Sequence, residues 1–89
     1  TMRQKEVLLE GYIEGVAKAD GWRSQESCMA AAGHANKWQA KAVAYVAWWE
    51  LCWTTAHAIF DDVLAGKRPV PTDKELIAAM PPMVWPVLP

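Results

Sequence analysis

The sequence has little of what marks several protein classes. Two cysteines among 89 residues are too few for a disulfide-stabilised scaffold. Lys and Arg number 9 against 10 Asp and Glu, so the basic excess of a nucleic-acid-binding surface is missing. Charged residues make up only 21% and hydrophobic residues 53%, which excludes a disordered chain. What remains is a single folded domain spanning residues 1–89.

Patterns that carry catalysis or bind metals are also missing. The spacings Cys28-x5-His34 and Cys52-x4-His57 do not match the paired ligands of a zinc site. His57 and Asp61 lie four residues apart, but no Ser or Cys is placed to complete a nucleophilic triad. The sequence contains no glycine-rich phosphate loop. We therefore expect no metal site, no cofactor and no enzymatic activity.

The first 35 residues predict one helix and leave a second segment open. Residues 3–20 form an amphipathic helix in this interpretation, ended by Gly21. A GxxxG spacing on this helix, formed by Gly11 and Gly15, would let another backbone approach closely. The apolar stripe of the helix consists of Leu9, Tyr12, Ile13, Val16 and Ala19. Residues 24–33 are either a short helix, N-capped by Ser24 and stopped by Gly33, or a loop.

The dominant predicted element is a long helix over residues 37–65. It contains neither Gly nor Pro, Gly66 follows it, and Asn36 with Gln39 resembles an N-terminal capping box. Its apolar residues recur in alternating steps of four and three, which predicts packing against another long helix. These positions are Trp38, Ala42, Tyr45, Trp49, Cys52, Ala56, Ile59 and Val63, widened by Val46, Trp53 and Phe60.

The apolar character of this long helix raises the question whether it spans a membrane. Residues 42–60 are apolar enough to raise the question, but Glu50 and His57 fall inside the segment. Its aromatic residues lie in the middle, whereas spanning helices place Trp and Tyr at the interfaces. We therefore expect no membrane partner.

Proline shapes the end of the chain. Pro69 and Pro71 predict an extended connector, after which a capping box of Thr72 and Glu75 opens a short helix over 73–80. Residues 81–89 are apolar, rich in Pro and extended. An exposed tail of this kind would be adhesive, so we expect it in a groove of its own chain, of a second copy or of a partner.

Six tryptophans provide the candidate interaction residues. Trp48 lies off the apolar seam on a polar side, so it is either covered by another element or an interface anchor. Trp85 in the tail is either an intramolecular strap or a Pro-rich docking segment, and Trp22 fits either role. The candidate partner-binding or dimer surface consists of Trp48, Trp49, Trp53, Tyr45, Trp85 and Trp22.

Residues 42–87 carry a family resemblance. The shared features are the segments 61–66, 67–72 and 75–77, followed by Pro81, Val84, Trp85 and Pro86. In these features the chain resembles small proteins of unassigned function encoded by tailed bacteriophages. The closing Trp-Pro-x-x-Pro of residues 85–89 is also similar to the ends of some phage tail assembly proteins. The resemblance implies a phage setting and no specific chemistry.

Together these features predict an all-α fold. One long helix pairs with the first helix as an antiparallel hairpin, and the short C-terminal helix and the tail lie across them. Two helices cannot cover so wide an apolar stripe, so a homodimer with a four-helix arrangement is expected. The predicted function is a non-enzymatic, phage-encoded interaction module that modulates a host protein in the host cytoplasm. The alternatives are a virion structural or tail-assembly protein and a holin-type membrane-active peptide, and nucleic acid is not an expected partner.

Overall fold

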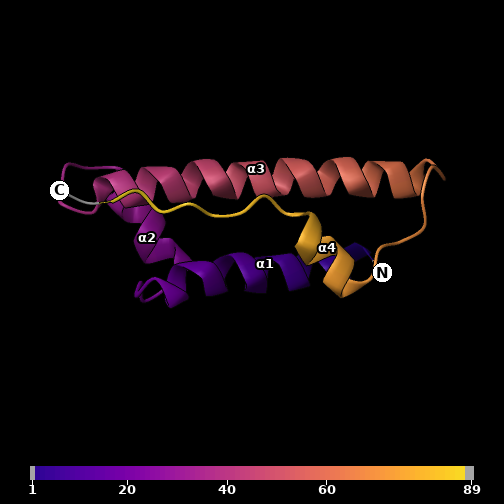
Figure 1. Ribbon diagram of the computed structural model, residues 1–89, viewed down its shortest axis with the longest axis horizontal. Helices are drawn as coiled ribbons and strands as arrows, with labels where there is room; N and C mark the ends of the chain where they lie inside the picture. Colours follow the sequence, from indigo (N-terminus) through magenta and orange to yellow (C-terminus); the bar gives the residue numbers. More distant parts are fainter. Residues whose placement is uncertain (1, 88–89) are drawn as a thin grey trace.

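The computed structural model describes residues 2–87, and every regular element in that range is a helix, which confirms the all-α fold class. The helices are α1 (Met2–Ala19), α2 (Gln25–Ala31), α3 (Gln39–Leu64) and α4 (Asp73–Ala79). Helices α1 and α3 lie side by side and run in opposite directions, while α2 joins them at one end (Figure 1). The molecule is elongated, with extents of 46 × 19 × 18 Å.

Two glycines end the longer helices, as the sequence predicts. Gly21 after α1 has a φ of +103° and Gly66 after α3 a φ of +76°. Such left-handed conformations are adopted readily by glycine because it has no Cβ. These turns redirect the chain into α2 and into the connector that leads to α4.

Capping boxes open both short helices. At α2, the backbone N–H of Ser27 donates to the Ser24 hydroxyl and the backbone N–H of Ser24 donates to the Ser27 hydroxyl. This local closure explains why residues 25–31 are helical and not a loop. At α4, the predicted pair of Thr72 and Glu75 is present, with N···O distances of 2.9 and 3.1 Å. The hydrogen bond from the Thr72 backbone lowers the pKa of Glu75.

The predicted cap of the long helix is wrong. Helix α3 begins at Gln39 after an N-cap at Trp38, which makes no side-chain capping bond. The Asn36 amide donates to the carbonyls of Ala31 and His34, and its oxygen accepts from the Trp38 N–H. Asn36 therefore stabilises the turn between α2 and α3. Helix α3 begins at Gln39, two residues after the predicted start at residue 37.

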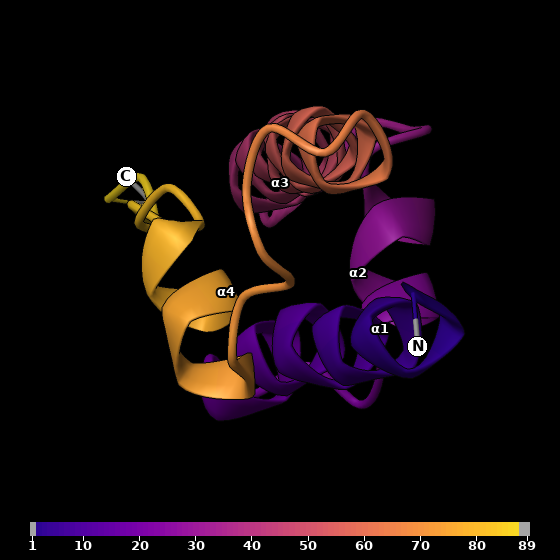
Figure 2. The same ribbon diagram turned by 90° about the vertical axis from the view of Figure 1, so that its right-hand side faces the viewer.

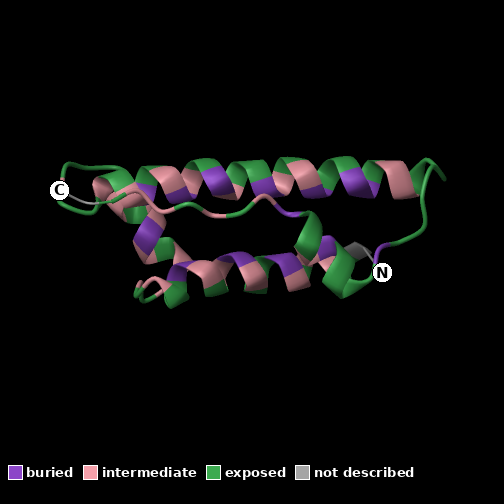
Figure 3. Cartoon of the chain, in the orientation of Figure 1, coloured by how far each residue is buried: buried purple, intermediate pink, exposed green. Residues whose placement is uncertain are grey.

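Helix α3 has neighbours on two flanks. In Figure 2, α2 lies on one side of the α1–α3 pair and α4 with the C-terminal segment on the other. The buried positions lie on the sides of the helices that are turned toward one another (Figure 3). They are Leu9, Ile13, Ala17, Cys28, Ala42, Tyr45, Trp48, Cys52, Ala56, Ile59, Phe60, Leu76 and Met80. Beside them, Lys5 of α1 forms an ion pair with Asp73 of α4.

Residues 81–87, which we call the strap, run extended along α3 (Figure 1). Trp85 stacks on Tyr45 with ring centroids 5.9 Å apart and an interplanar angle of 5°. The Lys41 Nζ lies 5.6 Å from the centroid of the Trp85 ring and 3.0 Å from an Asp20 carboxylate oxygen. The predicted tail therefore packs in a groove of its own chain. Residues 88–89 of that tail lie outside the described residues.

Candidate functional site

Two of the six candidate interaction residues belong to the core. Tyr45 is fully buried, and its hydroxyl oxygen lies 2.8 Å from the Ile13 carbonyl that accepts its hydrogen bond. Trp48 is only 5% exposed, and its indole N–H donates to the Pro81 carbonyl across 2.7 Å. Both side chains are therefore covered within the chain. Trp48 takes the first of its two predicted roles, because α1 and the strap cover the side of α3 on which it lies.

Trp22 lines a small cavity at the end of the molecule where α1 meets α3. The cavity measures about 310 Å³ and is lined by Asp20, Gly21, Trp22, Arg23, Trp38 and Lys41. Asp20 accepts a hydrogen bond from the Trp22 indole and also pairs with Lys41, so the charges at its centre compensate one another. Lys37 lies over the Trp38 ring, 4.5 Å from its centroid. Asp20, Trp22, Trp38 and Lys41 therefore each interact with another side chain of this end of the molecule.

Trp85 stacks on Tyr45, so it too is covered within the chain. The last two candidates, Trp49 and Trp53, are half-buried and line a larger groove between α1, α2 and α3. This groove has a volume of about 500 Å³, within the range of ligand sites in proteins. Its walls consist of Glu10, Glu14, Gln25, Glu26, Trp49, Trp53 and His57. We call it the acidic groove. It lies on the α2 side of the molecule, the flank opposite the strap.

Helical spacing builds the walls of the acidic groove. Glu10 and Glu14 lie one turn apart on α1, so their side chains share a face. Trp49 and Trp53 have the same spacing on α3, and the Trp53 ring contacts His57 one turn further along, with centroids 6.0 Å apart. Helix α2 closes one end with Gln25 and Glu26. The groove is therefore lined by carboxylates of α1 and α2 and by aromatic rings of α3.

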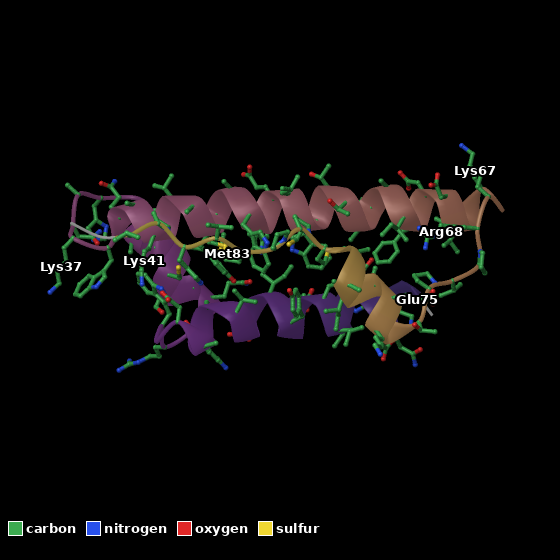
Figure 4. All side chains as sticks on the ribbon, in the orientation of Figure 1. Lys37, Lys41, Lys67, Arg68, Glu75 and Met83 are labelled. Atoms are coloured by element: carbon green, nitrogen blue, oxygen red, sulfur yellow. The ribbon has the colours of Figure 1, made fainter. Side chains whose placement is uncertain are left out.

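The carboxylates of the acidic groove have no cationic partner within residues 2–87. The ion pairs found there join Arg3 to Glu6, Lys5 to Asp73 and Lys41 to Asp20. Lys37 and Lys41 lie at one end of α3, and Lys67 and Arg68 at the other (Figure 4). The groove therefore carries three carboxylates, of Glu10, Glu14 and Glu26, that form no ion pair within residues 2–87.

A second exposed surface is the side of α3 that faces away from α1, which we call the outer face (Figure 3). Leu51 and Val43 are each 51% exposed on this helix. Alanines continue the apolar surface along the outer face, at Ala40, Ala47, Ala58 and Ala65. Glu50, Thr54 and Asp61 are also exposed on this side, so the outer face mixes apolar and polar residues. Large exposed apolar side chains of this kind can mark a surface that packs against another protein.

Within residues 2–87, the side chains that could act as nucleophiles or metal ligands either lie in the core or do not cluster. Cys28 and Cys52 are buried free thiols, and burial raises the pKa of each to about 11. At neutral pH such thiols are protonated and poor nucleophiles. Among the described residues, no cluster of three His, Cys, Asp or Glu side chains is arranged to hold a metal ion. In the same range no helix has both the length and the apolar character to cross a membrane.

No protein-family model, curated protein or solved structure matches this chain. The resemblance to phage proteins therefore stays a prediction, and the site has to be interpreted from its own geometry. The sequence-based interpretation found Trp49 and Trp53 but missed Glu10, Glu14 and Glu26. The available signal was the equal one-turn spacing of Glu10 and Glu14 on one helix and of the two tryptophans on the other.

Proposed function

We propose that the protein is a non-enzymatic interaction module that binds a partner protein through the acidic groove. The observation that carries this proposal is the position of Trp49 and Trp53, which are half-buried in a groove with unpaired carboxylates. Tryptophan is enriched at the energetic centres of protein interfaces, where a pocket of the partner completes its burial. In the phage setting that the sequence suggests, the partner is a host protein whose activity the complex alters in the host cytoplasm.

The alternative role in the virion has less support than this proposal. The virion role rests on the apolar C-terminal segment, which needs a surface to bind. In the structure Trp85 of the strap stacks on Tyr45, and the Pro81 carbonyl accepts from Trp48. The segment thus has a binding surface on its own chain, and detection of the protein in purified particles would be the evidence for the alternative.

The proposed function is tested by capture of partners from host lysate with matched tryptophan variants. Trp53→Ala removes one wall of the acidic groove, while Trp38→Ala removes a 47% exposed tryptophan outside it. A stoichiometric partner that is retained by Trp38→Ala and lost with Trp53→Ala supports the proposal, provided that circular dichroism shows both variants folded. A partner bound equally by both variants, or no stoichiometric partner at all, contradicts it.

We also propose that the α1–α3 hairpin pairs with a second copy through the outer face of α3. An antiparallel arrangement centred near Leu51 brings the start of α3, next to Lys37, close to Asp61 and Asp62 of the second copy. This charge complementarity and the exposed Leu51 and Val43 support a four-helix homodimer. The acidic groove lies on another flank of α3 and stays open in this arrangement.

A further inference from the structure

The acidic groove combines two rows of side chains with the same repeat. Glu10 and Glu14 follow one another along α1 with a rise of about 6 Å, given about 1.5 Å per residue in a helix. Trp49 and Trp53 repeat with the same rise along α3, which runs in the opposite direction. The groove therefore offers a ligand two carboxylates on α1 and two indole rings on α3, each set repeated after one helical turn.

The charge of the acidic groove requires a cationic ligand. Glu10, Glu14 and Glu26 contribute three carboxylates and have no ion pair within residues 2–87. The basic side chains of α3 and the following connector lie at the two ends of the helix and not beside the groove (Figure 4). Binding of cationic groups would relieve the mutual repulsion of the carboxylates, whereas an anionic or purely apolar ligand would not.

The neighbouring tryptophans distinguish arginine from lysine. A guanidinium group is planar, so it stacks on an indole ring while its edge donates paired hydrogen bonds to a carboxylate. An ammonium group is a compact, strongly hydrated point charge and does not form both contacts with the same geometry. Glu10 and Glu14 line the same groove as Trp49 and Trp53, so the residue types that such a dual contact requires are present.

We propose that the partner segment bound in the acidic groove carries two arginines one helical turn apart, at positions i and i+4. This inference rests on the proposed function, because it names the chemistry of the protein segment that the groove binds. Each arginine stacks on one tryptophan and pairs with one glutamate. Gln25 and Glu26 close the α2 end of the groove and limit the site to two such positions.

The inference is tested with an alanine-based helical peptide that has arginines at i and i+4. Matched peptides carry lysine, or citrulline, which keeps the shape of arginine but is neutral. We expect saturable binding of the arginine peptide at low salt, about tenfold or more tighter than the citrulline peptide. The indole N–H signals of Trp49 and Trp53 should shift in two-dimensional NMR spectra, and added salt should weaken binding. Equal affinity for the arginine and citrulline peptides overturns the inference.

Charge variants separate this inference from the proposed function. The double variant Glu10→Gln/Glu14→Gln should lose binding of the arginine peptide, while Glu50→Gln removes the same charge outside the groove and should retain it. Peptide binding that is unchanged in the double variant overturns the inference. A lysate partner that is lost with Trp53→Ala but retained by the double variant also overturns it, although the proposed function then stands. A partner whose capture does not depend on Trp53 overturns the proposed function itself.

Discussion

Trp48 and Pro81 are joined by a hydrogen bond that spans 33 residues of sequence. The indole N–H of Trp48 donates to the Pro81 carbonyl, and the indole ring also contacts Tyr12 and Tyr45, with centroids 6.2 and 5.8 Å away. A buried tryptophan usually finds a partner for its N–H. Here that partner is the first residue of the strap, so one side chain of α3 connects α1, the core and the strap.

Replacing Trp48 with phenylalanine should destabilise the protein. Trp48→Phe keeps much of the apolar surface but removes the donor, so the Pro81 carbonyl loses its partner at a cost of about 1–3 kcal/mol. The midpoint of urea unfolding, followed by circular dichroism, measures the change. Trp38→Phe is the control, because Trp38 is half-exposed and should tolerate the change. Equal midpoints for the two variants would contradict this assignment.

The buried thiols predict a loss of stability in alkali. Burial raises the pKa of Cys28 and Cys52 to about 11 in the folded state, from about 8.5 in an unfolded chain. Between these values the unfolded state releases thiol protons that the folded state retains, so the free energy of unfolding falls as pH rises. Burial also raises the pKa of Tyr45, which extends the decline to higher pH.

This decline is measured by urea unfolding at several pH values between about 8 and 11. Stability should be constant below the unfolded thiol pKa and fall above it. Cys52→Ala should weaken the pH dependence of the unfolding midpoint. Any loss of stability from the smaller side chain should lower the midpoint by the same amount at every pH. A wild-type midpoint that stays constant across the range would show that the thiols are not protected as the structure indicates.

Replacing Gly15 with alanine should increase the stability of the protein. A Cβ at Gly11 or Gly15 would meet no atom within 4 Å, so the expected close approach of another backbone at the GxxxG spacing is wrong within this chain. Gly15→Ala should stabilise α1 by about 1 kcal/mol, the difference in helix propensity. Gly66→Ala is the opposing control and should destabilise, because Gly66 has a φ of +76°. Thermal unfolding compares them, and a destabilised Gly15→Ala would contradict the prediction.

Leu51 tests the proposed homodimer. Leu51→Glu puts a charge at the centre of the outer face of α3 without touching the core, since Leu51 is half-exposed. Light scattering should give twice the 9.9 kDa chain mass for the wild type and a single chain for the variant, with the same helical signal. A wild type that is monomeric at high micromolar concentration would refute the dimer.

Local signals in the sequence predicted most helix ends. Gly21, Gly66 and the Thr72–Glu75 pair act through contacts a few residues apart, so their sequence neighbourhood contains the information. The predicted N-cap at Asn36 was wrong, because several backbone groups near its side chain compete for hydrogen bonds. Which of them bind Asn36 depends on the folded turn. Short-range chemistry is therefore predictable where one partner is available.

The burial of Trp48 and the acidic groove depend on contacts that periodicity does not contain. The alternating spacing of α3 assumes one long neighbouring helix, whereas α3 faces α1 with α2 on one side of this pair and the strap on the other (Figure 2). The strap position is fixed by pairs such as Tyr45 and Trp85, which lie 40 residues apart (85 − 45). Likewise, the groove arises because α2 connects α1 to α3 and the two long helices lie side by side (Figure 1), so that Glu14 and Trp49 line one groove.

The burial of both native cysteines makes the chain suitable for attachment to a solid support through one introduced cysteine. Both native thiols are buried, so a maleimide reagent at neutral pH should react with a cysteine introduced on the exterior and leave Cys28 and Cys52 unmodified. Val84 on the strap is 76% exposed and lies on the flank away from α2. Chains anchored through Val84→Cys would all be attached at the same residue of the strap, on the flank opposite the acidic groove.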